Sequence, residues 1–153
     1  MKFIVFCFSL FLLSSCASTA EPGEQVSSNY HLNESSTLED FKGKPSAIIF
    51  GGTFCPHCKT AAPVFKEKVW DFYKDQANLW INVIDGGKFE VAEVAQGLNS
   101  NLSFDDLTQS ECGYVPSWVV LDAFGNVFDS SCGTVKPLET LVEDLEKLLK
   151  VSS

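Results

Sequence analysis

The chain has 153 residues, of which 45% are hydrophobic and 20% charged, a composition typical of one packed domain and not of global disorder. Asp and Glu outnumber Lys and Arg by 20 to 11, which gives a formal net charge of −9. An acidic surface of this kind repels phosphate backbones and anionic lipid headgroups, so we expect no nucleic-acid partner and no membrane attachment through charge.

Residues 1–15 predict a secretory signal peptide. Lys2 precedes an apolar run of about ten residues, too short to span a bilayer as a finished helix. The run ends in Leu-Ser-Ser-Cys at Cys16, which resembles the lipobox of bacterial lipoproteins, where the cysteine becomes lipidated and forms the mature N-terminus. We therefore expect a lipid on Cys16. The alternative is an ordinary signal peptide that is cut near Ala17–Ala20, with Cys16 discarded.

Residues 16–36 predict a flexible tether, because they are rich in Ser, Glu and Asn and show little apolar periodicity. His31 stands alone in this segment and is expected to be a solvated side chain. Four cysteines follow the tether, an even number in a chain expected outside the cytoplasm, where disulfides persist. They are Cys55, Cys58, Cys112 and Cys132.

Residues 37–150 predict one folded domain in which strands alternate with helices. Continuous apolar runs indicate buried strands, and the last of them forms a hairpin with a further strand. The four expected strands span 46–50, 79–85, 117–121 and 126–130. Helices are expected at 56–74 with a kink at Pro63, at 90–98, and at 137–150. This order predicts an α/β domain with a mixed four-stranded sheet flanked by helices on both faces.

The chemistry is expected at the motif Cys55-Pro56-His57-Cys58. The pair follows a buried strand and opens a helix, where free backbone N–H groups and the helix dipole favour a thiolate at Cys55. His57 adds a donor or a positive charge, and Pro56 fits the first turn because its missing N–H costs nothing there. A stabilised thiolate is a good leaving group, which shifts the couple toward oxidising behaviour. We expect Cys55 to exchange with a substrate disulfide and the more buried Cys58 to resolve the mixed disulfide.

Zinc binding and a purely structural disulfide are the alternatives for this pair. Zinc needs two more ligands, and Cys112 and Cys132 stand 20 residues apart instead of forming a second Cys-x-x-Cys. A disulfide between residues i and i+3 closes a very short loop and adds little stability. We therefore favour a redox pair that needs neither a metal nor a dissociable cofactor.

Several segments resemble the thioredoxin superfamily of thiol–disulfide oxidoreductases over about residues 37–150. They are the segment IIFGGTFCPHCKTAAPVF, the residues Gly113-Tyr114-Val115-Pro116 before a strand, the turn at 122–125 and the closing helix. The resemblance implies that Pro116 is cis and packs against the active cysteines, and that Val115 offers its backbone to a substrate strand. Tyr114 would border the same groove, and local packing is an equally good role for it.

The dipeptide between the cysteines and the preceding Phe54 resemble the DsbA branch of periplasmic oxidases. Superfamily members often carry an acid six positions before the first cysteine, where this chain has Ile49, so the acceptor of the Cys58 proton is unassigned. Only residues 86–115 are available for the helical domain inserted in DsbA proteins, which is too few. The build is closer to thioredoxin or to the membrane-anchored TlpA/ResA reductases, so the resemblance leaves the direction of electron flow open.

Cys112 and Cys132 form the second pair of interest. In the expected hairpin Cys132 lies near Pro116, and Cys112 precedes Pro116 by four residues. The two can reach the roughly 4.4–6.8 Å Cα separation that a disulfide needs. We favour a structural disulfide that pins the cis-proline loop. The alternative is a second redox pair that relays electrons to Cys55 and Cys58.

The sequence thus predicts a lipid-anchored thiol–disulfide oxidoreductase on the periplasmic side of a bacterial membrane. Its expected partners are exported proteins with thiols or disulfides, and a membrane redox protein that resets the cysteines. The alternative is a non-catalytic lipoprotein of the same fold that binds a partner or handles copper through Cys55, Cys58 and His57. Methionine ligands would favour copper, but the only Met is the initiator.

Overall fold

The computed structural model describes residues 32–151. The predicted signal peptide, the lipid on Cys16 and the tether up to residue 31 lie outside the described residues. Within residues 32–151, every helix is too short or too polar to be a membrane-spanning segment.

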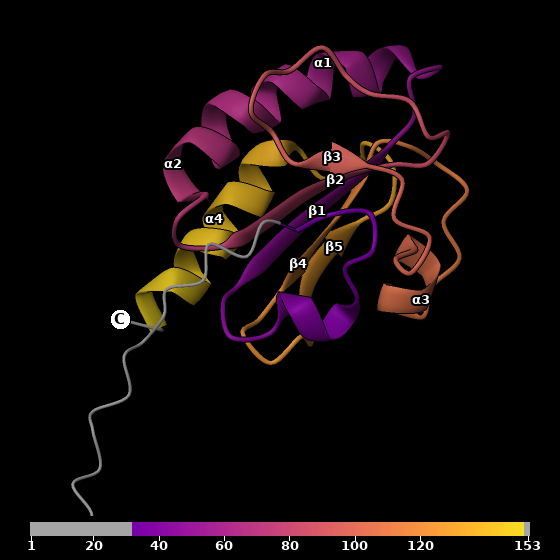
Figure 1. Ribbon diagram of the computed structural model, residues 1–153. Helices are drawn as coiled ribbons and strands as arrows, with labels where there is room; N and C mark the ends of the chain where they lie inside the picture. Colours follow the sequence, from indigo (N-terminus) through magenta and orange to yellow (C-terminus); the bar gives the residue numbers. More distant parts are fainter. Residues whose placement is uncertain (1–31, 152–153) are drawn as a thin grey trace, which may run out of the picture.

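Five strands form one mixed sheet in the order β3-β2-β1-β4-β5 (Figure 1). Their bounds are β1 Ser46–Gly51, β2 Asn78–Val83, β3 Gln96–Gly97, β4 Ser117–Leu121 and β5 Val127–Ser131. Strand β1 is parallel to β2, as a helical crossover requires, and antiparallel to β4, which forms the expected hairpin with β5. The domain is therefore of the mixed α/β class that the sequence predicted.

The expectation of four strands was wrong, because β3 replaces the helix predicted at 90–98. Glu93 has a φ of 67°, in the left-handed region that ends a helix. The Gln96 side chain accepts from the N–H of Phe89 and donates to its carbonyl, and these two hydrogen bonds hold the loop between the two residues in place. The backbone is then free to pair with β2, and the N–H of Ile81 donates to Ala95. Periodicity alone cannot detect a strand of two residues.

Helices cover both faces of the sheet (Figure 1). They are η1 Leu38–Phe41, α1 Pro56–Phe65, the π-helical turn η2 Lys66–Trp70, α2 Asp71–Tyr73, α3 Phe104–Thr108 and α4 Leu138–Val151. Segments α1, η2 and α2 follow one another without a break. The irregularity of this helix is the π-helical turn just after Pro63, where a kink at the proline was expected.

Alternation along the strands divides the apolar side chains between two cores. Ala47 and Ile49 of β1 face the layer of α1, η2 and α4, where Leu141 and Leu145 of α4 are fully buried. The other face of β1 carries residues such as Ile48, which pack with Leu32 and with residues of η1 and α3. Because β1 is buried on both faces, the residues that leave its carboxyl end begin from a fixed position.

Leu32, which lies in the predicted tether, packs into the domain. Leu32 is only 6% exposed, and it belongs to the core below η1 and α3. The buried side chain of Asn99 donates to the carbonyls of Asn33 and Ser36, at 3.2 and 2.7 Å. The last five residues of the predicted tether are therefore part of the domain, held by a side chain distant in sequence.

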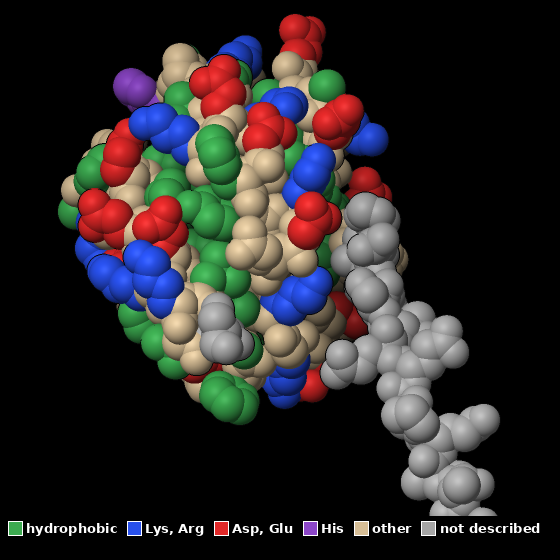
Figure 2. Space-filling view, turned by 90° about the vertical axis from the view of Figure 1, so that its left-hand side faces the viewer, with side chains coloured by type: hydrophobic (Ala, Val, Ile, Leu, Met, Phe, Trp, Pro, Cys, Tyr) green, Lys and Arg blue, Asp and Glu red, His purple; other side chains and the backbone are tan. Residues whose placement is uncertain are grey.

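Figure 2 shows the side of the molecule on which α2 and α4 lie. Acidic and basic side chains are interspersed over this face, with hydrophobic side chains in a band among them. One exposed ion pair, Lys68 with Glu139 at 2.6 Å, links η2 to α4. Exposed pairs contribute little to stability, so the α4 layer is held mainly by its buried leucines.

Candidate active site

The two cysteines of the motif lie at the junction of β1 and α1. Cys55 is the N-cap residue of α1, with extended backbone, and Pro56 occupies the first helical position. The Sγ of Cys55 accepts a hydrogen bond from the backbone N–H of Cys58 at 3.1 Å. Both are free thiols, 7% and 2% exposed respectively. The helix start thus presents an N–H donor to the sulfur of Cys55, as the sequence led us to expect.

Cys58 lies beneath the end of β1. A Cβ atom added to Gly51 would stand 3.4 Å from the Cβ and 3.5 Å from the Sγ of Cys58, so the helix approaches the strand closely here. Burial, together with its hydrogen bond to Cys55, raises the pKa of the Cys58 thiol to about 12. Cys58 is therefore held as a neutral thiol, and it needs a base before it can attack a disulfide.

The loop that leads to Cys55 is fixed by Asp85, which lies just beyond β2. Its Oδ2 accepts from the backbone N–H of Thr53 at 3.0 Å and from the Thr53 hydroxyl at 2.5 Å. The hydrogen bond from this hydroxyl lowers the pKa of Asp85, and backbone N–H donors lower it further. From the sequence, Asp85 was expected only as the end of a strand, although its place after a buried strand and before Gly86-Gly87 is a signal for this role.

The cis-proline loop faces Cys55 from the start of β4. The Val115–Pro116 peptide bond is cis, and the thiol of Cys55 donates to the Val115 carbonyl with 3.5 Å between sulfur and oxygen. The structure therefore brings Val115 and Pro116 to the cysteine pair. Tyr114 points outward and is 73% exposed, and Phe54 beside Cys55 is 66% exposed. Phe54 precedes Cys55 and Tyr114 precedes Val115, so each of the two segments that meet at the sulfur carries a large exposed aromatic side chain.

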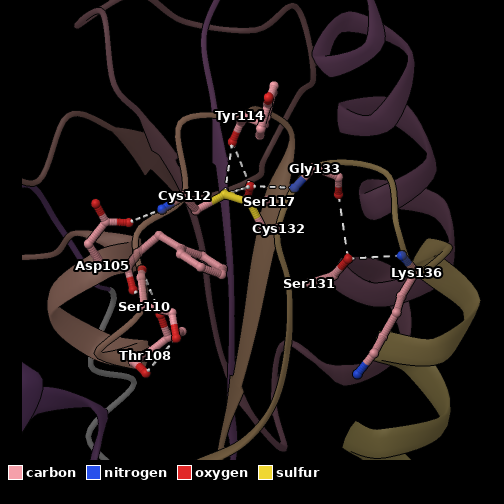
Figure 3. The surroundings of a disulfide bond; sticks show 11 residues. Asp105, Thr108, Ser110, Cys112, Tyr114, Ser117, Ser131, Cys132, Gly133 and Lys136 are labelled. Carbon is pink, nitrogen blue, oxygen red and sulfur yellow. Dashed lines mark hydrogen bonds between the residues drawn. A yellow bond between two sulfur atoms is a disulfide. The ribbon is translucent and has the colours of Figure 1, made fainter.

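The second pair is a disulfide beside this loop (Figure 3). Cys112 and Cys132 are joined with a Cα separation of 5.7 Å, within the range for a disulfide. The backbone N–H of Cys112 donates to Asp105 of α3 at 2.8 Å. The hydroxyl of Ser117, which the sequence analysis did not single out, lies 3.3 Å from the sulfur of Cys112.

His57 lies on the exposed side of α1 and lines a mostly apolar cavity of about 280 Å³ between α1 and the start of α4. Ile49 and Pro116 line the same cavity, so the residue that replaces the usual superfamily acid, Ile49, borders this cavity. The other titratable residue in its lining is Lys136, which pairs with Asp129 and lies 5.9 Å from the centre of the Trp118 ring. Sequence reasoning missed Lys136 because only the turn after β5 brings it here.

No set of three or more His, Cys, Asp or Glu side chains gathers as a metal site anywhere in residues 32–151. The chemistry that the arrangement supports is exchange between thiols and disulfides.

The fold and the cysteine pair define a thioredoxin-like thiol–disulfide oxidoreductase domain. The model of the AhpC/TSA family matches residues 24–130, more than half of the chain, and the chain belongs to that family. No curated protein matches the sequence.

Solved structures share this fold. The structure of MTB dsbF in its mixed oxidized and reduced forms has a TM-score of 0.55 and 19% identity, over 78% of this chain and 96% of dsbF. The exposed lipoprotein thioredoxin Etrx1 of Streptococcus pneumoniae has a TM-score of 0.53 and 14% identity, over 72% and 90% of the two chains. A thioredoxin-like protein in its oxidized form has a TM-score of 0.55 and 27% identity, over 76% and 88%.

Proposed function

We propose that this chain is an extracytoplasmic thiol–disulfide oxidoreductase that exchanges disulfides with exported proteins through Cys55 and Cys58. One observation carries the proposal. The Sγ of Cys55 lies at the N-terminus of α1, accepts the N–H of Cys58, and faces the backbone carbonyl of Val115 in the cis-proline loop. A sulfur placed in this way has donors that stabilise a thiolate on one side and a peptide edge for a substrate strand on the other.

The proposed exchange has two steps. The thiolate of Cys55 attacks a substrate disulfide, a mixed disulfide forms, and one substrate sulfur leaves as a thiolate. Cys58 then gives up its proton and attacks the Sγ of Cys55, which releases the second substrate thiol. The substrate is reduced by two electrons, and the cysteine pair is oxidised to a disulfide. The reverse sequence forms a disulfide in the substrate.

The second step is the demanding one, because the pKa of Cys58 is about 12. The buried neighbour Ile49 offers no carboxylate to take its proton. The thiolate released in the first step is a base, and we propose that it accepts this proton. The same substrate group then leaves as a neutral thiol.

The proposed setting is the periplasmic side of a bacterial membrane, with a lipid on Cys16 as the anchor. The lipobox-like sequence supports this setting, and so does the likeness to a structure described as an exposed lipoprotein thioredoxin. The exposed Phe54 and Tyr114 beside Cys55 support protein substrates, since apolar aromatic side chains commonly anchor such contacts. A membrane redox protein would reset the cysteines after each cycle.

Reduction of insulin and refolding of a scrambled disulfide protein test the activity, with wild type compared with Cys55→Ser. We expect activity that disappears in Cys55→Ser, and a stable mixed disulfide in Cys58→Ser, because the resolving thiol is missing. Equal rates in wild type and Cys55→Ser would contradict the proposal. Stoichiometric copper or partner binding without exchange would instead favour a non-catalytic binding module.

The reduction potential of the Cys55–Cys58 pair, measured in glutathione buffers, gives the direction. A value toward about −120 mV, as for strong oxidants, would make the protein a disulfide-forming oxidase and give His57 its expected role. A value near about −270 mV, as in thioredoxin, would make the protein a reductase.

A further inference from the structure

Ser117 is a buried hydroxyl at the base of the cis-proline loop (Figure 3). It is 1% exposed and is the first residue of β4, directly after Pro116. Its hydroxyl donates to the carbonyl of Tyr114 at 2.6 Å and accepts the backbone N–H of Gly133 at 2.9 Å. The rest of β4 is apolar, so this hydroxyl is the exception in a buried strand.

The hydrogen bond from the Ser117 hydroxyl to the Tyr114 carbonyl closes a ring that contains the residues facing Cys55. Tyr114 and Ser117 are the ends of a four-residue segment, and Val115 and cis-Pro116 are its middle. Because peptide units are planar, fixing the Tyr114 carbonyl at one end and β4 at the other limits the rotation of the Val115 carbonyl between them. That carbonyl lies 3.5 Å from the Sγ of Cys55.

Gly133, the second partner of the Ser117 hydroxyl, is held in place by its neighbours. Gly133 follows Cys132, whose disulfide partner Cys112 has its sulfur 3.6 Å from the Tyr114 carbonyl. The hydroxyl of Ser131 accepts the N–H of Lys136, which ties down the turn that contains Gly133. Ser117 therefore connects the cis-proline loop to an anchored turn, and the anchor is the disulfide-bonded end of β5.

Gly133 also fits closely against the loop. Its φ of +64° lies in the left-handed region, and an added Cβ would stand 3.4 Å from the Cβ of Tyr114. The backbone of Tyr114 and the backbone of Gly133 thus approach each other with the Ser117 hydroxyl between their polar groups. A side chain without a hydroxyl would leave the half-buried N–H of Gly133 without its protein partner.

We propose that Ser117 is a positioning residue for substrate: its hydroxyl, through Tyr114 and Gly133, sets the backbone of Val115 where a substrate strand bound at Cys55 must pair with it. The inference rests on the proposed exchange activity and adds a specificity determinant to it. Ser117 does not touch the reacting sulfur. Its effect should therefore depend on whether the substrate has a peptide backbone that can use the loop.

Two disulfide reagents separate this role from a general structural one. One is dithiobis(nitrobenzoate), which offers only a small disulfide. The other is an unstructured peptide whose single cysteine is disulfide-linked to thionitrobenzoate. In both reactions the Cys55 thiolate attacks the disulfide, thionitrobenzoate leaves with the electron pair of the broken bond, and Cys58 then displaces the second group. Release of thionitrobenzoate is read by absorbance, with the full reduced chain and the Cys112–Cys132 disulfide intact.

We expect Ser117→Ala to react with the peptide reagent about fivefold more slowly, the weight of one lost hydrogen bond, with the loss mainly in KM. The rate with the small reagent should stay within about twofold of wild type. Ser117→Thr keeps a hydroxyl and should restore most of the peptide rate.

Ser46→Ala is the matched control. Like Ser117, Ser46 is fully buried, is the first residue of a strand, and donates to a backbone carbonyl, that of Phe41. It lies at the end of β1 that pairs with Leu121, whereas Ser117 pairs with Phe50 at the end near the cysteines. It should lower stability to a similar extent and leave the ratio of the two rates unchanged.

Two results would overturn the inference. One is a ratio of peptide rate to small-reagent rate in Ser117→Ala that equals that of wild type, whether both rates stay the same or both fall equally. The other is the same change of this ratio in Ser46→Ala. Failure of the proposed function looks different, since wild type would then release no more thionitrobenzoate than Cys55→Ser with either reagent. In that event, amide hydrogen exchange of Val115 in wild type and Ser117→Ala still decides, and equal exchange would refute the positioning role.

Discussion

Asp85 holds Thr53 by two hydrogen bonds to one carboxylate oxygen, at 3.0 Å from the backbone nitrogen and 2.5 Å from the hydroxyl. Thr53 stands two residues before Cys55, so the end of β2 controls the loop that carries the reactive sulfur. The contact crosses 32 residues of sequence, and it depends on the parallel pairing of β1 with β2. Parallel strands end at the same edge, which is why their following loops meet.

The first prediction concerns this carboxylate in acid. The pKa of Asp85 is lowered from 3.8, chiefly by the hydrogen bond from the Thr53 hydroxyl. Its contribution to stability is therefore present above pH 3.8 and is lost as the pH falls through the lower folded value. The melting temperature of wild type should fall more steeply below pH 4 than that of Asp85→Ala. Parallel curves for the two proteins would contradict the assignment.

The second prediction concerns Cys58 in alkali. Its pKa is raised from 9.0 to about 12, mainly by burial, so the stability of the reduced protein is complete below pH 9 and is lost as the pH rises toward 12. Tyr73 is raised to about 12 by burial and by its bond to Glu146, so it adds a similar dependence. Unfolding of reduced wild type and of Cys58→Ala should differ in slope over this range. The same slope in both would show that Cys58 is not buried as described.

A companion measurement uses reactivity. Of the two active-site cysteines, with the Cys112–Cys132 disulfide intact, iodoacetamide at pH 8 should label Cys55 and spare Cys58, because the neutral and buried Cys58 thiol is a poor nucleophile. Mass spectrometry after proteolysis identifies the labelled cysteine. Equal labelling of both cysteines in the native protein would contradict the structure, and labelling of both in urea is the positive control.

The third prediction concerns the Cys112–Cys132 disulfide. It closes a loop with a sequence separation of 20 residues, for which chain entropy gives about 3 kcal/mol of stabilisation. The double variant Cys112→Ser, Cys132→Ser should lose about this amount in urea unfolding, with a steeper slope against urea because the unfolded chain is less compact. Wild type treated with a reductant that opens this disulfide should lose a similar amount. A loss well under about 1 kcal/mol would mean that the bond does not constrain the unfolded chain.

The fourth prediction concerns the amino end of the domain. Asn99→Ala removes the donors to the carbonyls of Asn33 and Ser36, and it should cost about 2 kcal/mol because the bond to the carbonyl of the buried Ser36 is lost. Limited proteolysis should then cut near residues 33–36, which wild type protects. Asn101→Ala is the control, since Asn101 is exposed and its contact with Ser35 is long, at 3.5 Å. Equal protection in Asn99→Ala and wild type would contradict the clamp.

The fifth prediction concerns the missing acid. Ile49→Asp places a carboxylate in the buried layer between β1 and α1 and should destabilise the domain by about 3 kcal/mol, whereas Ile49→Val should cost about 1 kcal/mol. If a base near Cys58 limits the second step, the same variant should resolve mixed disulfides faster than Ile49→Val. An unchanged rate would support the released thiolate as the proton acceptor.

The parts of the fold that were predicted correctly are those with a local signature. Apolar runs gave β1, β2 and β4, and the position of Cys55 between a strand and a helix gave the start of α1. These features depend on the sequence of a few neighbouring residues, so periodicity and capping rules detect them.

The parts that were missed depend on partners distant in the sequence. Strand β3 forms because the Gln96 side chain satisfies the backbone of residue 89, and Leu32 is packed because Asn99 binds the chain that follows it. Ser117 and Asp85 likewise acquire their roles only when the sheet brings Gly133 and Thr53 beside them. No property of these residues alone distinguishes them from ordinary strand or turn residues.

The attachment at Leu32 has a mechanical consequence. A force that pulls on the chain ahead of Leu32 is resisted first by the bonds from Asn99 to Asn33 and Ser36. Asn82 bonds to both the N–H and the carbonyl of Asn99, and therefore passes the load to β2, three residues before Asp85. Tension applied at Leu32 is thus transmitted to β2, the strand after which Asp85 supports the loop of Cys55, so a pull on the chain at Leu32 and the geometry at Cys55 are mechanically connected.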